Sequence, residues 1–140
     1  MADSEQEIVT EWIEQIPDHD RLFLRVHITW VPDRKIVPGI FREHGGAMSV
    51  DWEKYSTAEE TRLRGRDPEK NGVVSLVAGA VRAIEQMTVE HEPIRSNRAH
   101  SGIHGLNSRG QLSAQVMKTM RRAKLFHLVK DWEIQPSEEA

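Results

Sequence analysis

The first apolar pattern in the chain has the period of an α-helix. Between positions 4 and 16, apolar residues recur at about 3.6-residue spacing: Ile8, Val9, Trp12, Ile13 and Ile16. Ser4-x-x-Glu7 has the form of a capping box, and Pro17 follows as a helix breaker. We therefore expect an acidic N-terminal helix within residues 1–20.

The second pattern alternates between apolar and polar positions, which is typical of a half-buried β-strand. Over residues 22–31, one set of alternating positions is apolar: Leu24, Val26, Ile28 and Trp30. The intervening positions include Arg25 and His27, which therefore share the more polar face of the predicted strand. This face is either exposed to water or lines a cleft, where both side chains would be available to a ligand.

Short elements and turns follow in the middle of the chain. Residues 40–50 predict one or two strands, broken at the Gly-Gly pair of positions 45 and 46, where the backbone can take positive φ. A capping-box pattern at positions 57–60 predicts a short helix that ends near Leu63. Residues 65–72, with the sequence GRDPEKNG, predict a loop.

Residues 73–87 are compatible with two structures. Their apolar residues fit a helical stripe, but the β-branched Val73-Val74 opening and Gly79 also fit a buried strand, a bend and a second element. Periodicity does not decide between these two. The next residues, 88–91, predict a short strand that stops before Pro93.

The C-terminal part predicts a helix and a final strand. Ser108-x-x-Gln111 has the form of a cap, and a helical pattern runs from there to about Lys124. We expect its inner face to carry Val116, Met120 and Ala123. We expect its outer face to carry Lys118, Arg121 and Arg122. Alternation over residues 126–134 then predicts a strand, and residues 136–140 form an acidic tail.

Strands and helices that do not alternate regularly indicate an α+β fold. We expect a small, mostly antiparallel sheet packed by an N-terminal and a C-terminal helix, in a single domain of residues 1–140. A hydrophobic content of 38 % with 29 % charged residues is typical of a globular protein. No apolar run approaches the ~18 residues of a membrane helix. The acidic start lacks a signal-peptide pattern, and cysteine is absent. We therefore expect a cytoplasmic protein that does not bind membranes.

Charge is distributed unevenly, although the net charge is only −3. Residues 1–20 contain seven acidic side chains and no Lys or Arg, whereas residues 93–130 contain eight Lys or Arg and no acidic side chain. This basic stretch favours either binding of an anionic partner or attraction to the acidic N-terminal segment within the fold. Its outward helix face over residues 118–124 fits contact with a nucleic-acid backbone, or simply a solvated surface.

The basic stretch begins with a segment that is suited to orient a phosphate. Residues 91–105 hold histidines, arginines, an asparagine and glycines close together. Arginine offers a planar set of donors to phosphate oxygens, and histidine exchanges protons near neutral pH. The candidate catalytic residues are His91, His100 and His104. The candidate ligand-binding residues are Arg95, Asn97 and Arg98, with Arg25 and His27 joining them if the strand face meets this segment. Asp51 and Glu53 are candidate acids for such a composite site. The alternative is an exposed polar loop without a site.

A metal site is a second interpretation of the same histidines. His100-x-x-x-His104 has a helical spacing, with His91 as a third zinc ligand. Gly102 and Gly105 disfavour a helix here, and the basic stretch supplies no carboxylate. The nucleotide-binding patterns GxxxxGK[ST] and GxGxxG are absent, as is GxSxG. We therefore expect neither a metal nor another cofactor.

Four short motifs together resemble a recurring pattern in an uncharacterised family of small bacterial proteins. The motifs are Ser49-Val50-Asp51, Gly72-Val73-Val74, His91-x-Pro93 and Asn97-x-Ala99-His100. The resemblance spans roughly residues 22–135 and implies a bacterial source and a compact α+β fold. It also favours a strand at the start of residues 73–87. It implies no activity and assigns no catalytic residue.

The sequence therefore predicts a domain that binds or acts on a phosphate-bearing ligand, such as a nucleotide or nucleic acid, through the His/Arg/Asn segment. It does not decide whether the protein is an enzyme. The alternative is a non-enzymatic interaction module whose basic stretch meets an acidic protein partner. The dependence of binding on ionic strength distinguishes the ligand-binding domain from the interaction module, because a partner held by surface charge dissociates steeply as ionic strength rises.

Overall fold

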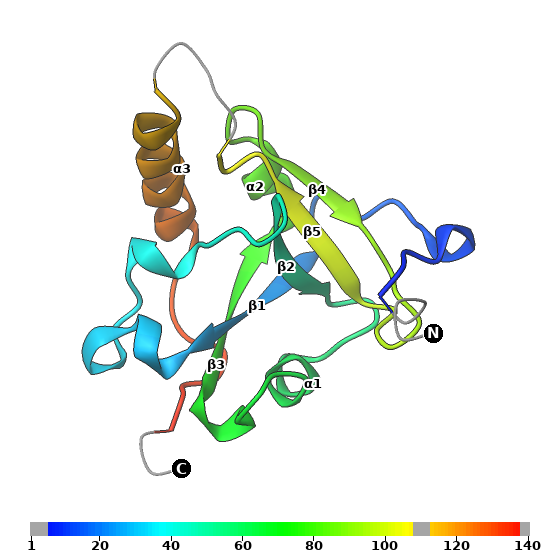
Figure 1. The fold of residues 1–140 in the computed structure, drawn as a ribbon, viewed down its shortest axis with the longest axis horizontal. Coiled ribbons are helices and arrows are strands. Elements are labelled where there is room, and N and C mark those ends of the chain that lie inside the picture. The colour runs from blue at the N-terminus through cyan, green and yellow to red at the C-terminus, as the bar shows by residue number, and fades with distance from the viewer. Residues whose placement is uncertain (1–5, 108–112, 138–140) are drawn as a thin grey trace.

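A five-stranded antiparallel sheet forms the centre of the molecule (Figure 1). The computed structural model describes residues 6–107 and 113–137, so most of the predicted acidic tail lies outside it. The strands are β1 (Arg21–His27), β2 (Ala47–Trp52), β3 (Asn71–Val77), β4 (Thr88–His91) and β5 (His100–His104), in the spatial order β3-β1-β2-β5-β4. All neighbouring strands are antiparallel. The predicted α+β class with an antiparallel sheet is confirmed.

The described parts of the chain contain three α-helices: α1 (Ala58–Leu63), α2 (Ala78–Arg82) and α3 (Ala114–Leu128). Helices α2 and α3 cover one face of the sheet, since Val81 and Leu125 belong to the same buried cluster as Trp52. Helix α1 lies against the opposite face, where Thr61 donates a hydrogen bond to Asp51. The sheet is therefore covered by helices on both sides, but much more completely on the first.

Alternation along the strands gives the sheet two different faces. Residues that pair across strands share a face, so the register places Leu22 and Trp52 on one side and Phe23 and Asp51 on the other. The first face carries the hydrophobic core. Arg25 lies on the second face, as the alternation predicted.

The predicted N-terminal helix is wrong for the residues that the structure describes. Residues 6–20 follow an extended path with one short 3₁₀ turn, Thr10–Trp12. Ser4 of the expected capping box lies outside the described residues. The Val9 N–H donates to the carbonyl of Pro93 at 2.7 Å, and an isolated β-bridge joins the same two segments. A helix of this length is marginal on its own, and the bonds to the β4–β5 hairpin stabilise the extended form instead.

The strands predicted before the C-terminal helix are present with shifted ends. Strand β1 stops at His27, whose Nδ1 accepts a hydrogen bond from the Thr29 N–H at 3.2 Å and so caps a 3₁₀ turn over Ile28–Trp30. Strand β3 begins already at Asn71. Of the two structures compatible with residues 73–87, a strand followed by a second element is confirmed, because α2 follows β3 directly. The short strand predicted next is β4, and the capping box before α1 is present in full.

The predicted C-terminal helix is confirmed, also with shifted ends. Helix α3 begins after Ser113, whose hydroxyl accepts a hydrogen bond from the Val116 N–H. The cap expected at residues 108–111 lies outside the described residues. At the other end, the helix continues through Leu128. The final strand predicted over residues 126–134 is therefore wrong, because its first apolar residues pack against the core as the last helical turn.

The buried face of α3 differs from the predicted one. Its buried residues follow a spacing of four: Met117, Arg121 and Leu125. Val116 and Met120, expected inside, are exposed. The prediction assumed that every basic residue faces water, but Arg121 is buried and donates through Nη1 to the carbonyl of Leu106 at 3.2 Å. A long side chain with a backbone acceptor can be buried despite its charge.

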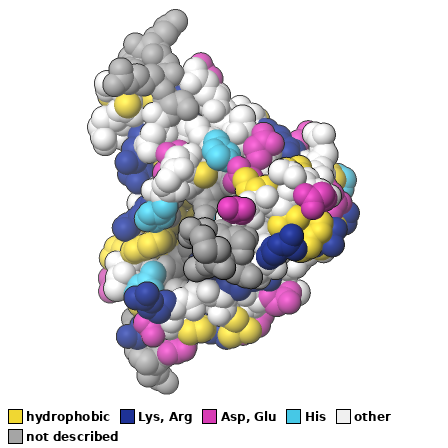
Figure 2. Space-filling model, turned by 45° about the vertical axis from the view of Figure 1, so that its right-hand side comes forward, with side chains coloured by type: hydrophobic (Ala, Val, Ile, Leu, Met, Phe, Trp, Pro, Cys, Tyr) yellow, Lys and Arg dark blue, Asp and Glu magenta, His cyan; other side chains and the backbone are white. Residues whose placement is uncertain are grey.

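On the face shown in Figure 2, side chains of opposite charge are mixed. In the space-filling view, Asp and Glu side chains lie among Lys, Arg and His side chains (Figure 2). The large apolar side chains that are exposed among the described residues are Ile8, Ile13, Leu63, Val77, Val116 and Met120. Within the described ranges, no helix has the length and apolar character needed to cross a membrane.

Candidate functional site

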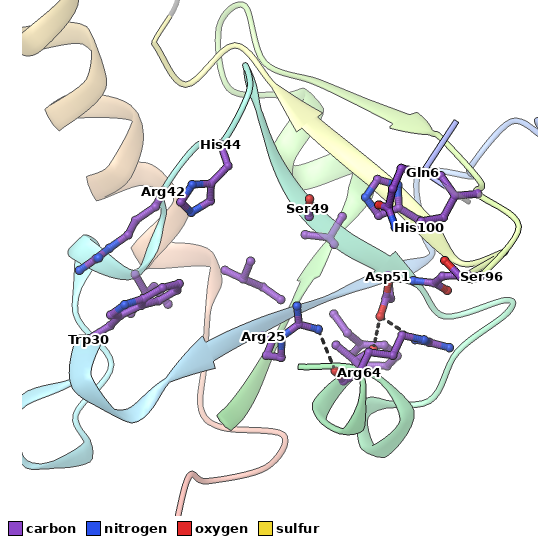
Figure 3. A pocket seen from close by; sticks show the side chains of 17 residues that line it. Gln6, Arg25, Trp30, Arg42, His44, Ser49, Asp51, Arg64, Ser96 and His100 are labelled. Atoms are coloured by element: carbon purple, nitrogen blue, oxygen red, sulfur yellow. Dashed lines mark hydrogen bonds and ion pairs between the residues drawn. The ribbon is translucent and has the colours of Figure 1, made fainter. Parts of the chain in front are cut away.

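A pocket of about 540 Å³ lies on the second face of the sheet, opposite the core (Figure 3). Its walls come from α1, from the β4–β5 hairpin and from the segment between β1 and β2. Its floor is formed by alternate residues of three neighbouring strands: Phe23 and Arg25 of β1, Ser49 and Asp51 of β2, and His100 of β5.

The strand register fixes the middle of this floor. Asp51 of β2 pairs with His100 of β5, so the two side chains stand side by side on one face. Arg25 of the neighbouring strand β1 faces the same way. Its side chain passes over Gly65, where a Cβ atom would overlap the arginine, and its Nη1 donates to the carbonyl of Thr61 at 3.1 Å. The glycine thus leaves the space through which Arg25 reaches α1.

Asp51 is the one acidic side chain among the described residues that line the pocket, and it is held by hydrogen bonds within the protein. It is only 5 % exposed and accepts hydrogen bonds from Thr61 Oγ1 at 2.8 Å, Arg64 Nη1 at 2.7 Å and Asn97 Nδ2 at 2.8 Å. The Asn97 side-chain oxygen accepts in turn from the Ala99 N–H at 3.1 Å. This network ties α1 and the hairpin to the sheet, and Arg64 compensates the charge of Asp51.

Three arginines line the pocket and keep donors for a ligand. Each of them uses one guanidinium nitrogen within the protein: Nη1 of Arg25, Nε of Arg42 and Nη1 of Arg64. Their other guanidinium N–H groups have no hydrogen-bond partner in the described part of the chain. Since an arginine has five N–H donors, each retains free donors beside the cavity.

Two histidines, His44 and His100, add titratable groups to the lining. Nδ1 of His100 lies 2.8 Å from the carbonyl oxygen of Glu92. A carbonyl only accepts, so Nδ1 carries the hydrogen, and Nε2 of the neutral ring is an acceptor. Nε2 has no partner among the residues described, and it can therefore accept a hydrogen bond from a bound ligand.

Of the eight predicted site residues, the pocket brings together three: Arg25, Asn97 and His100. Asp51, a candidate acid for a composite site, lines it as well. Glu53, the other candidate acid, forms an ion pair with Arg21 at 3.3 Å and does not line the pocket. The polar face of β1 and the His/Arg/Asn segment therefore meet at the pocket. Arg25 represents the first, and Asn97 and His100 represent the second.

Two further predicted residues belong to an aromatic clamp made of Trp12, Tyr55, His91 and Arg98. The Arg98 guanidinium lies 5.2 Å from the ring centroid of Trp12 and 4.7 Å from that of Tyr55. His91 is 3 % exposed; its Nδ1 accepts from the Glu14 N–H at 3.0 Å, and its Nε2 donates to the Arg98 carbonyl at 2.7 Å. Burial lowers the pKa of His91, so the neutral ring is favoured. Both ring nitrogens of His91 are thus bonded within the fold, and the exposed Arg98 guanidinium contacts two rings.

The last three predicted residues do not line the pocket either. Nε2 of His104 pairs with the Glu92 carboxylate at 2.8 Å, above Gly102, where a Cβ atom would overlap that carboxylate. His27 caps the turn after β1. Arg95 is exposed on the hairpin.

Two of the three arginines in the described lining are residues that the sequence did not single out. Arg42 and His44 lie in the segment between β1 and β2, where no periodic pattern marks them. Arg64 directly follows α1. The capping box predicted the start of that helix, but only the register of β2 shows that Asp51 is the partner of Arg64.

The predicted basic stretch does not form one continuous surface. Arg98 lies in the aromatic clamp, Arg121 is buried, and Nε of Arg122 donates to a backbone carbonyl at 2.8 Å. Arg109 lies outside the described residues. The exposed Lys and Arg residues of the stretch, within the described ranges, are Arg95, Arg98, Lys124 and Lys130.

Comparisons of the chain with protein-family models, with curated proteins and with solved structures found no match. Among the residues that the structure describes, no group of three or more His, Asp or Glu side chains is arranged to hold a metal ion. The pocket itself is therefore the basis for inferring a function.

Proposed function

We propose that the pocket on the second face of the sheet binds a phosphate-bearing ligand. The observation that carries this proposal is the imbalance of charge in the described lining. Three arginines contribute free N–H donors, while Asp51 already accepts three hydrogen bonds. An oxyanion in the cavity gains charge-assisted hydrogen bonds from the guanidinium groups and meets no free carboxylate.

Other lining residues suit the same ligand. Ser49 and Ser96 offer hydroxyl donors, and His100 offers a group for proton transfer. The apolar side chains of Phe23 and Ile40 lower the local dielectric constant, which strengthens hydrogen bonds to an anion. A volume of about 540 Å³ also falls in the range of small-molecule sites, roughly 300–1,000 Å³.

The variant Arg25→Gln tests this proposal, because Arg25 stands in the middle of the pocket floor (Figure 3). We expect the affinity for phosphate esters, measured by isothermal titration calorimetry, to fall by about tenfold or more. The control is Arg95→Gln, which removes the same charge from an exposed position outside the lining. We expect it to change the affinity by less than about twofold. Equal losses in two folded variants would indicate unspecific attraction and contradict the proposal.

An acidic protein partner for the basic stretch stays a prediction. Arg121 and Arg122 of that stretch are engaged within the fold, which leaves fewer cations for such a surface. The pocket is therefore the stronger candidate.

A further inference from the structure

The pocket has two different ends. Figure 3 shows Arg64 and His100 at one end, Trp30 and Arg42 at the other, and Arg25 between them. The first end offers hydrogen-bond donors around the Asp51 network. The second end offers an indole ring. A ligand that used only the first end would leave the aromatic end without a contact.

Trp30 is held as a wall of the cavity. It is the last residue of the 3₁₀ turn Ile28–Trp30, is half-buried and lines the pocket. The Arg42 guanidinium lies 4.5 Å from the centroid of the ring and is fixed by a hydrogen bond from its Nε to the Gly39 carbonyl at 3.0 Å. Indole rings and guanidinium planes are surfaces on which nucleobases stack.

We propose that the phosphate-bearing ligand is a nucleotide, with its phosphate beside Arg25 and Arg64 and its base beside Trp30 and Arg42. This inference rests on the proposed function and adds the class of ligand. A cavity of about 540 Å³ is of the size that takes a whole small molecule, and a nucleotide would use both of its ends.

A sugar phosphate without a base would leave the indole end of the pocket without a contact. Sugar hydroxyl groups need acceptors as well as donors. The Asp51 carboxylate already accepts three hydrogen bonds and the side-chain oxygen of Asn97 accepts one from the backbone, which leaves mainly Nε2 of His100 and the hydroxyls of Ser49 and Ser96 as acceptors. A base instead gains a stacking contact that does not depend on acceptors.

A single nucleotide also fits better than a nucleic-acid strand. Proteins that bind single strands line the path of the backbone with continuous positive charge. Here Asp and Glu side chains lie among the basic ones over the visible face (Figure 2), and the chain carries a net charge of −3. Three arginines are gathered in the described lining of one cavity.

Calorimetric titration of the full chain tests the class of ligand. The ligands are inorganic phosphate, ribose 5-phosphate and the common nucleoside 5′-monophosphates. We expect at least one monophosphate to bind about tenfold or more tightly than ribose 5-phosphate, because only the monophosphate adds a stacked base.

Two variants of Trp30 test whether the indole ring causes the difference in affinity between the monophosphate and ribose 5-phosphate. Trp30→Leu removes the ring, and we expect it to abolish the advantage of the monophosphate while the affinity for ribose 5-phosphate stays within about twofold. Trp30→Phe keeps an aromatic ring, and we expect it to retain most of the advantage. Circular dichroism checks that each variant folds. If Trp30→Leu does not fold, the nucleotide assignment is still tested by the comparison of monophosphates with ribose 5-phosphate in the wild type and in Trp30→Phe.

Equal affinities of ribose 5-phosphate and every monophosphate would overturn the nucleotide assignment and leave phosphate binding in place. The nucleotide assignment would also be overturned if folded Trp30→Leu still bound the monophosphate more tightly than ribose 5-phosphate by the same factor as the wild type. Binding of a single-stranded oligonucleotide without binding of any monophosphate would overturn it as well. If no phosphate compound binds at all, the proposed function itself fails.

Discussion

The two sides of the β4–β5 hairpin use the same kinds of side chain in different ways. On one side, the aromatic clamp holds Arg98 between two rings and His91 between two backbone groups. On the other side, Arg25 and His100 line the pocket with nitrogen atoms that have no partner among the described residues. The difference lies in what the side chains face: the Arg98 guanidinium lies against two aromatic rings, whereas Arg25 and His100 line a cavity. Polar groups whose partners lie within the protein, such as the two ring nitrogens of His91, stabilise the fold, whereas polar groups beside a cavity are available to a ligand.

Neighbouring residues of the hairpin reach these two sides. Ser101 of β5 pairs with His91 and is buried on the core face, whereas the preceding residue, His100, faces the pocket. A shift of one position along a strand moves a side chain to the other face. Asn97 and Arg98 differ in the same way, since Asn97 belongs to the pocket wall and Arg98 to the clamp.

The largest expected effect on stability comes from His91→Ala. This variant leaves the Glu14 N–H and the Arg98 carbonyl without their buried partner, and it removes an imidazole whose centroid lies 4.9 Å from that of the Trp52 ring. We expect the free energy of unfolding, measured by urea denaturation, to fall by about 3 kcal/mol. Affinity for phosphate compounds, measured where the variant is folded, should not change. A weakened affinity there would mean that the clamp belongs to the binding site.

Asp51→Asn is expected to affect stability and binding in opposite directions. The amide keeps the size of the side chain but loses the charge that Arg64 compensates, so we expect the free energy of unfolding to fall by about 2 kcal/mol. Affinity for a phosphate ester should rise by about threefold or more, because a negative charge beside the ligand is removed. Urea denaturation and calorimetry measure the two effects. A lower affinity would show that the geometry of the network matters more than its charge.

The sequence predicted those parts of the fold that depend on neighbouring residues. Alternation assigned Arg25 to the second face, and a capping box marked the start of α1. Predictions failed where distant contacts override local preference. Residues 8–16 have helical periodicity, yet a hydrogen bond from Val9 to the hairpin favours an extended path. Arg121 is charged, yet a carbonyl acceptor allows its burial.

The candidate site could be predicted only in part, for a similar reason. A local cluster of histidines and arginines indicated the hairpin but did not separate its two sides. That separation depends on the register of β5 against β2 and β4. Arg42 and Arg64 line the pocket because tertiary contacts position the segments that carry them. No local sequence pattern predicts that these two residues belong to the site.

Stability should decrease in acid through His91, by a smaller amount than in His91→Ala. Burial lowers the pKa of His91, while the nearby charges of Glu14, Arg98 and Lys54 act in opposing directions. An unperturbed histidine titrates at 6.5, so below that pH the unfolded state binds a proton that the native state does not. The stabilisation is therefore present above this pH and is lost as the pH falls toward the folded pKa, by up to about 1.4 kcal/mol per pH unit.

Urea denaturation between about pH 5 and pH 8 measures this dependence. The control is His91→Gln, since glutamine also offers one acceptor and a donor but does not titrate. We expect the variant to have a flatter dependence on pH than the wild type. The same slope in both proteins would assign the effect to other groups.

The smallest expected effect comes from Arg98→Met, and it compares the two sides of the hairpin most directly. The variant removes a guanidinium that contacts two aromatic rings while keeping an apolar stem, so we expect a loss of about 1 kcal/mol in the free energy of unfolding. Arg98→Lys, which keeps the charge, should lose less. Affinity for phosphate esters should stay within about twofold, because Arg98 does not line the pocket. A fall as large as that of Arg25→Gln would place Arg98 in the binding site, and the distinction between clamp and pocket would not hold.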